Sequence, residues 1–229
     1  MATASFSSQR RRLAGEIRQQ FVADAVLTMS EIVEAVQQRL RTLMDEAAPS
    51  REMQVRRDAW TFYQRHRHTW REATAKAWNE ALVPPATPSR KEDAPDFGGL
   101  SLVGNDVVEN KILASRMVLR VMDKVSAELD DLRLRIRYLE DSDDLDRQDI
   151  LRPDVLVLIL VEEWAASGMP SGSWPLINDA VQLLLSERLK KAYQRGNRTL
   201  IDKGVMPTIE LKDRVKRASP QAGAPRAFP

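Results

Sequence analysis

An apolar residue recurs every three or four positions between residues 12 and 46, and no proline interrupts the pattern. The recurring positions are Leu13, Ile17, Phe21, Ala25, Met29, Ile32, Val36, Leu40 and Leu43. This spacing is the period of one face of an α-helix, so it predicts one long amphipathic helix. Ala48, Pro49 and Ser50 end the pattern. A helix of this length must cover its apolar face with a partner, and this requirement governs the rest of the fold.

Four further stretches predict helices. The second helix runs from about Ser50, as N-cap, to Val83, and the third runs from an N-cap at Asn105 to about Glu140. On the third helix, Val108, Ile112, Val118, Val121, Val125, Leu129, Leu132, Ile136 and Leu139 mark the apolar side. The fourth begins with Pro153 in its first turn, and the fifth spans roughly residues 175–203, with Gly204 as its C′ residue and Gly196 as a point where it could break.

One segment is ambiguous between helix and strand. Residues 155–161 read VLVLILV, which would also suit a buried strand. We favour a helix, because Glu162, Glu163, Trp164 and two alanines continue it and the chain offers no other strand to pair with.

These elements predict an all-α fold with about five main helices, divided into a long N-terminal helical hairpin (12–83) and a C-terminal helical bundle (98–211). Residues 84–97 hold four prolines and mixed charges, which predicts a linker. We expect disorder in the N-terminus (1–11) and in the basic, Pro/Ala-rich tail (212–229). A hairpin has only one layer, so it should dock on the second half of the chain or dimerise.

Composition excludes several function classes. The chain has no cysteine, which removes disulfide frameworks, thiolate metal sites and cysteine nucleophiles. It lacks G-x-S-x-G, Walker A and G-x-G-x-x-G motifs, and we expect no cofactor and no metal. The longest apolar run is the seven residues from Val155 to Val161, too short for a bilayer, and no secretory h-region follows the first ten residues. We therefore expect a cytoplasmic protein.

The net charge of +2 hides a basic segment between residues 51 and 71. Its candidate residues for binding an anion or a partner are Arg56, Arg57, Arg65, Arg67 and Arg71, with Trp60, Tyr63 and Trp70 interleaved. This combination suits nucleic-acid binding through phosphates and stacked bases. The heptad spacing of Tyr63, Trp70 and Ala77 equally suits a packing face with an arginine-rich solvent side. His66 and His68 point about 200° apart on a helix, so they do not chelate one metal together.

The opposite charge gathers between Glu140 and Asp149, where six acids stand against one arginine. The spacing fails the EF-hand pattern, because Arg152 takes its twelfth position. We expect a solvated loop whose Asp141, Asp143, Asp144 and Asp146 form an acidic partner surface. This loop could attract a basic segment, including the N-terminus or tail of the same chain.

Three motifs give the chain a resemblance to a known family. They are FGGLSLVGNDVVENKILASRMVLRV (97–121), a segment ending in proline (150–153) before an apolar helix, and Gly204-Val205-Met206-Pro207 at the end of the last helix. Together they resemble the N-terminal part of the proteobacterial domain-of-unknown-function family 1631, over about residues 15–211. Some members are labelled thymidine phosphorylase, but nothing in this chain points to nucleoside phosphorolysis. The resemblance implies the helical fold and no site residues.

These observations favour a bacterial, non-enzymatic module for protein–protein interaction or regulation, with a protein partner or self-association. The alternative is a nucleic-acid-binding protein that uses the arginine-rich second helix. An enzyme of unknown reaction is the third possibility, since no catalytic motif is present.

Overall fold

The computed structural model describes residues 2–83, 105–170 and 172–210. It contains five helices: α1 (Ala2–Asp45), α2 (Ser50–Glu80), α3 (Asn105–Glu140), α4 (Pro153–Ala166) and α5 (Trp174–Asp202). The described residues contain no strand, so the all-α prediction is confirmed. The VLVLILV segment is helix, as favoured. The predicted linker (84–97) and tail (212–229) lie outside the described residues.

The helix ends differ from the sequence predictions in three places. Helix α1 begins at Ala2 rather than near residue 12, so residues 2–11, expected to be disordered, are its first turns. Helix α2 ends at Glu80, before Val83. The N-cap of α2 is Pro49 rather than Ser50, and no side chain caps this end.

The end of α5 follows the sequence prediction closely. Gly204 has φ +76°, in the left-handed region that glycine adopts without a steric penalty. The Gly204 N–H donates to the Ile201 carbonyl, and the Val205 N–H donates to the Leu200 carbonyl, both at 2.9 Å. These two bonds form a Schellman motif, which satisfies carbonyls that the helix leaves without partners.

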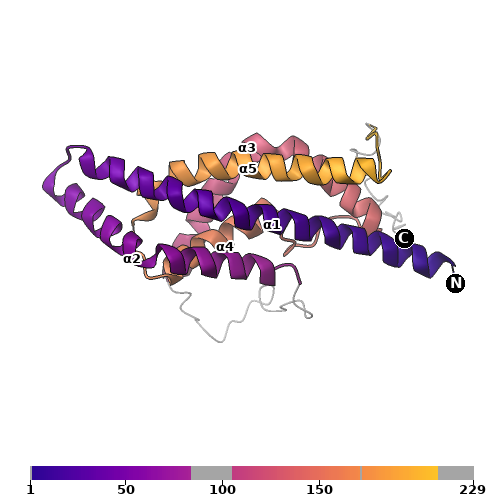
Figure 1. The fold of residues 1–229 in the computed structure, drawn as a ribbon, viewed down its shortest axis with the longest axis horizontal. Coiled ribbons are helices and arrows are strands. Elements are labelled where there is room, and N and C mark those ends of the chain that lie inside the picture. The colour runs from indigo at the N-terminus through magenta and orange to yellow at the C-terminus, as the bar shows by residue number, and fades with distance from the viewer. Residues whose placement is uncertain (1, 84–104, 171, 211–229) are drawn as a thin grey trace, which may run out of the picture.

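Helix α1 lies along the middle of the bundle and contacts α2, α3 and α5 (Figure 1). It runs antiparallel to α5, as shown by the ion pairs Glu16–Lys203, Asp24–Arg195 and Glu31–Arg188. Helix α3 runs parallel to α5, with Arg120 beside Gln182 and Glu128 beside Lys190. Helix α4 packs between α2 and α3.

One continuous core joins the two halves of the chain. It includes Ile17 and Met29 of α1, Trp70 of α2, Ile136 of α3 and Leu160 of α4, each at most 1% exposed. The hairpin therefore docks on the second half, as its single layer requires.

Gly196 lies inside α5 and does not interrupt it. A Cβ atom at this position would stand 3.3 Å from Leu132 Cδ1 and 3.5 Å from Ile17 Cγ2. The glycine thus lets α1, α3 and α5 approach closely at one level of the bundle. None of the helices in the described ranges is both long and apolar enough to span a membrane.

Candidate functional site

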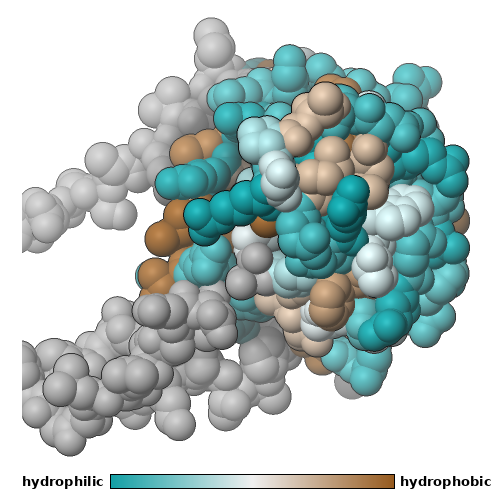
Figure 2. Space-filling model, turned by 90° about the vertical axis from the view of Figure 1, so that its left-hand side faces the viewer, coloured by the Kyte–Doolittle hydropathy of each residue, from teal (hydrophilic) through white to brown (hydrophobic). Residues whose placement is uncertain are grey.

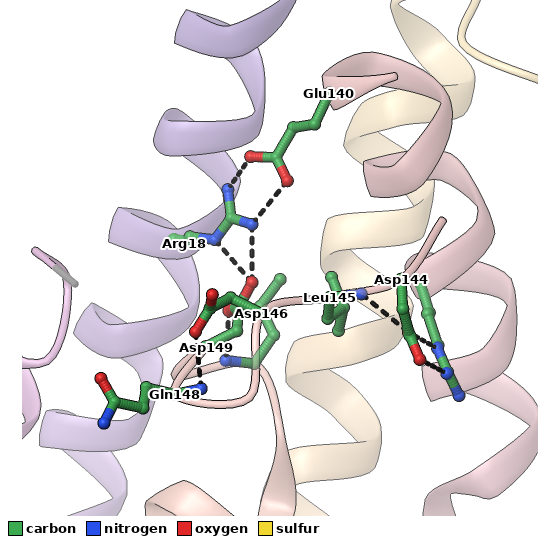
Figure 3. A network of polar contacts seen from close by, with 9 residues as sticks. Arg18, Glu140, Asp144, Leu145, Asp146, Gln148 and Asp149 are labelled. Carbon is green, nitrogen blue, oxygen red and sulfur yellow. Dashed lines mark hydrogen bonds and ion pairs between the residues drawn. The ribbon is translucent and has the colours of Figure 1, made fainter. Parts of the chain in front are cut away.

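The acidic segment after α3 is held by an arginine of α1. Arg18 forms a fork with Glu140, with Nη1 2.5 Å from Oε1 and Nη2 3.0 Å from Oε2. Its Nε and Nη2 also donate to Asp149 Oδ2 at 3.0 and 2.6 Å. Figure 3 shows Arg18 between the two carboxylates. Burial alone would lower the pKa of Arg18, but the hydrogen bonds and charges of Glu140 and Asp149 outweigh it and raise that pKa.

The carboxylates of this segment also organise its own backbone. Asp149 is 4% exposed, and its Oδ1 accepts the Leu151 N–H at 2.9 Å. Asp144 accepts the Leu145 N–H at 2.7 Å and pairs with Arg133 of α3. Asp146 Oδ1 accepts the Gln148 N–H at 2.8 Å. The turns between α3 and α4 are therefore built by these side chains.

The prediction of a solvated acidic surface holds for three of its four residues. Asp141, Asp143 and Asp146 are exposed, but Asp144 is half-buried in its pair with Arg133. Asp149 is buried. Among the described residues, the basic groups that pair with the segment are Arg18, well inside α1, and Arg133 of α3, rather than the extreme N-terminus. The reason is proximity, because α1 runs past the end of α3 at this level.

The five candidate arginines of α2 do not form one patch. Arg56 is 8% exposed, and its Nη1 donates to the Leu43 and Glu46 carbonyls at 2.7 and 3.1 Å. It therefore serves carbonyl groups at the end of α1 that have no partner within the helix. Arg67 donates to Gln37 of α1, and both Arg67 and Arg71 are half-buried. Only Arg57 and Arg65 are exposed.

The aromatic residues interleaved with these arginines belong mainly to the core. Tyr63 and Trp70 are 0% exposed, so neither offers a surface on which a base could stack. The Tyr63 hydroxyl donates to the Val33 carbonyl at 2.5 Å, and burial raises the pKa of this phenol. The indole N–H groups of Trp70 and Trp78 donate to the α4 carbonyls of Leu160 and Leu156, at 3.2 and 3.1 Å. The packing interpretation of α2 thus holds for its aromatic face.

The histidines of α2 differ in their surroundings. His66 is half-buried and stacks on Phe62 with ring centroids 6.2 Å apart, whereas His68 is exposed. Among the described residues, no group of three or more His, Asp or Glu side chains is arranged to hold a metal ion.

The N-terminal half of α3 presents a surface that the sequence did not predict. Val108 and Ile112, assigned to the apolar side that packs in the core, are each 47% exposed, and Leu119 is 69% exposed. The buried residues at this level are Ala114, Met117 and Val121, so the packed side of the helix lies elsewhere on its circumference. In the view of Figure 2, apolar residues gather along the left edge of the molecule, beside a largely hydrophilic surface.

A groove runs beside this surface, between α3 and the first turn of α5. We call it the α3–α5 groove; its lining includes Leu113, Arg116, Leu119 and Arg120 of α3 with Trp174 and Pro175 of α5. Its volume is about 380 Å³. Trp174 is 2% exposed, and its ring packs edge-on against Trp164 at 5.6 Å. The sequence indicated this groove only through the apolar residues of α3 that do not share the buried side of the helix.

Comparison with known proteins gives one match. The family model described as the N-terminal domain of a protein of unknown function (DUF1631) matches residues 9–204, which is most of the chain. No curated protein and no solved structure gave a significant match.

Proposed function

Since the chain belongs to the family of DUF1631 N-terminal domains, we propose a function for that domain as a unit: a non-enzymatic module that binds another protein. The observation that carries this proposal is the exposed apolar side of α3, formed by Val108, Ile112 and Leu119. Exposed apolar residues that share one face favour a protein-binding surface, because their transfer from water on docking is favourable.

The contacts of the charged residues that were candidates for a binding site support the same proposal. The ion pairs of Arg18 with Glu140 and Asp149 hold α1 against the segment after α3. Arg56 donates to the Leu43 carbonyl near the end of α1. These groups make contacts within the fold that stabilise its tertiary arrangement. The nucleic-acid alternative lost its main argument when Arg56, Tyr63 and Trp70 proved to be buried. The α3 surface, in contrast, stays exposed to solvent beside the other helices that the structure describes.

A photo-crosslinking experiment tests the proposal. A photoreactive amino acid replaces Leu119 in one variant and Leu27 in another, and both are expressed in the organism that makes the protein. The two leucines are matched, since each is 69% exposed and they lie on different helices. We expect a cross-linked adduct of defined mass from position 119 and none from position 27. Equal labelling at both positions, or no adduct from position 119, would contradict the proposal.

A further inference from the structure

We propose that a pocket at one end of the bundle binds a small organic anion, with its carboxylate or phosphate group at Arg10 and its apolar body on the floor of the pocket. We call it the α1–α3–α5 pocket, because the N-terminal part of α1, the last turn of α3 and the residues after α5 line it. The N-terminus of α1 and the end of α5 lie at the same end of the bundle (Figure 1). The site uses other residues than the exposed side of α3, so it goes beyond the proposed function and is independent of it.

The pocket has the size and the floor of a small-molecule site. Its volume is about 630 Å³, within the range of about 300–1,000 Å³ that is usual for ligand pockets. Leu139 and Val205 are buried, and the half-buried Leu13 lines the pocket with them. These three side chains offer an apolar floor, on which the body of a ligand would be withdrawn from water.

Arg10 is the group that would hold the anion. Its guanidinium carbon lies 4.5 Å from the centroid of the Tyr138 ring, so the cation stacks on this ring. Its Nε is buried without a hydrogen-bond partner, and no carboxylate among the described residues pairs with the guanidinium. A buried donor is costly unless an acceptor meets it. The guanidinium fork fits the oxygens of a carboxylate or a phosphate, so an anion would use donors that Arg10 already presents.

The other charges that line the pocket leave it positive. They are two further cations, Arg12 and Lys203, and one acid, Glu16. Glu16 pairs with Arg12 at 3.2 Å and lies 3.9 Å from Lys203, so two cations share this one carboxylate. With Arg10, the lining carries three positive charges and one negative charge, an excess of two.

The acids nearest to the lining in sequence do not cancel this excess. Glu140 pairs with Arg18 at 2.5 Å, and Asp202 pairs with Arg198 at 3.4 Å. Asp141 is exposed and is not part of the lining. The charge of the pocket therefore favours an anion over a neutral or cationic ligand of the same shape.

Residues 211–229, which follow the pocket in sequence, do not match it in charge. They carry five cations and one acid, a net charge of +4; these are Lys212, Arg214, Lys216, Arg217, Arg226 and Asp213. Because like charges repel, this segment is disfavoured as the occupant, and an anion from outside the chain is favoured.

Four naphthalene compounds of similar size test the proposal. Naphthoate and naphthyl phosphate are anions, naphthalenemethanol is neutral and naphthylmethylammonium is a cation. Each is titrated into the full chain with labelled leucine and valine methyl groups, and the affinity is taken from the methyl NMR shifts. We expect both anions to bind, and the neutral and cationic compounds to bind at least about tenfold more weakly, because they cannot accept a charge-assisted hydrogen bond from Arg10.

The same titrations separate the head group from the body and locate the site. Inorganic phosphate, which has no apolar body, should bind at least about tenfold more weakly than naphthyl phosphate. The anion that binds more tightly identifies whether the pocket takes a carboxylate or a phosphate. Both anions should shift the methyl signals of Leu13, Leu139 and Val205 and leave those of Leu27, exposed on α1 outside the pocket, unchanged.

Two neighbouring arginines give a matched pair of variants. Arg10→Gln removes the cation that stacks on Tyr138, whereas Arg11→Gln removes an exposed cation outside the lining. Arg10→Gln should weaken both anions by about tenfold or more and leave the neutral compound unchanged. Arg11→Gln should change every affinity by less than about twofold, because water and salt screen an exposed charge.

Four results would overturn the proposal. They are a Kd weaker than about 5 mM for both anions, equally tight binding of the neutral compound, equal affinities of the two arginine variants for the anions, and methyl shifts confined to residues outside the pocket. The compound series uses the wild-type chain, so it decides the matter even if Arg10→Gln does not fold. Failure here leaves the cross-link at position 119 untouched, and that cross-link alone decides the proposed function.

Discussion

Replacing Arg18 with methionine tests whether the acidic segment after α3 is part of the fold. The side chains of Arg18 and Asp149 are 16% and 2% exposed, so the substitution leaves the Asp149 carboxylate buried without its cation. Asp149 keeps the hydrogen bond from the Leu151 N–H, and Glu140, with 26% of its side chain exposed, can regain water. Removing one partner of a buried ion pair costs about 3–5 kcal/mol. Because of these compensations, we expect the lower end, about 3 kcal/mol.

Urea unfolding, followed by circular dichroism and tryptophan fluorescence, measures this loss. The midpoint should fall while the slope of free energy against urea stays the same. The matched control is Arg12→Met, which removes an exposed ion pair with Glu16 whose side chains are 82% and 46% exposed. That change should stay within about 0.5 kcal/mol.

A double variant identifies the cause of the loss. Asp149→Asn removes the stranded charge and keeps an oxygen that can accept the Leu151 N–H. Combined with Arg18→Met, it should recover a large part of the lost stability. The reasoning fails if Arg18→Met costs less than about 1 kcal/mol, if Arg12→Met costs as much, or if the double variant is no more stable than Arg18→Met alone.

Two further predictions concern other polar groups. Arg56→Met should destabilise the fold by about 1.5–3 kcal/mol, because two carbonyls at the end of α1 lose a charged donor. The control is the neighbouring, exposed Arg57, whose replacement by methionine should change the free energy of unfolding by less than about 0.5 kcal/mol. Equal urea midpoints for the two variants would contradict the role given to Arg56. Asp24 has its pKa raised by burial, which the charge of Arg195 only partly offsets, so the folded state binds this proton more readily than the unfolded chain. As pH falls from neutral through the folded-state pKa of Asp24, the wild-type protein should therefore gain stability relative to the Asp24→Asn variant. The gain should stop once the pH is below the ordinary pKa of an aspartate. Urea unfolding of both proteins across this pH range measures the difference, and a constant or opposite difference would contradict the prediction.

The helices could be predicted because their positions depend on the spacing of nearby residues and on the conformational preferences of single residues. Apolar residues at three- and four-residue spacing mark a helix whatever covers them, and this placed all five elements. Glu140 and Pro153 bound helices as expected, because α3 ends and α4 begins where a charged or proline-containing segment interrupts the pattern. Asn105, predicted as the N-cap of the third helix, is the first residue of α3. Gly204 adopts positive φ because a Schellman motif favours glycine at that position.

The candidate site was harder to predict for a physical reason. An arginine on a helix looks the same in sequence whether it faces water or the end of a neighbouring helix. Arg56 and Arg57 are adjacent in the chain, yet one is buried against α1 and the other is exposed. The Arg18 contacts join residues 122 and 131 positions apart, and no local pattern specifies such a pair.

The sequence by itself determined the fold class, the positions of the five helices, the conformation after α5 and the resemblance to the family. Each of these depends on spacing, on a residue's own conformational preference or on a motif. The tertiary structure decided which charges bind within the fold and which side of α3 stays uncovered. Val108 and Ile112 carry the same apolar signal as Val121 and Val125 farther along α3, but the first two are exposed and the others are buried. Periodicity specifies that a helix has an apolar side, whereas only the packing of the other helices decides how far along its length that side is covered.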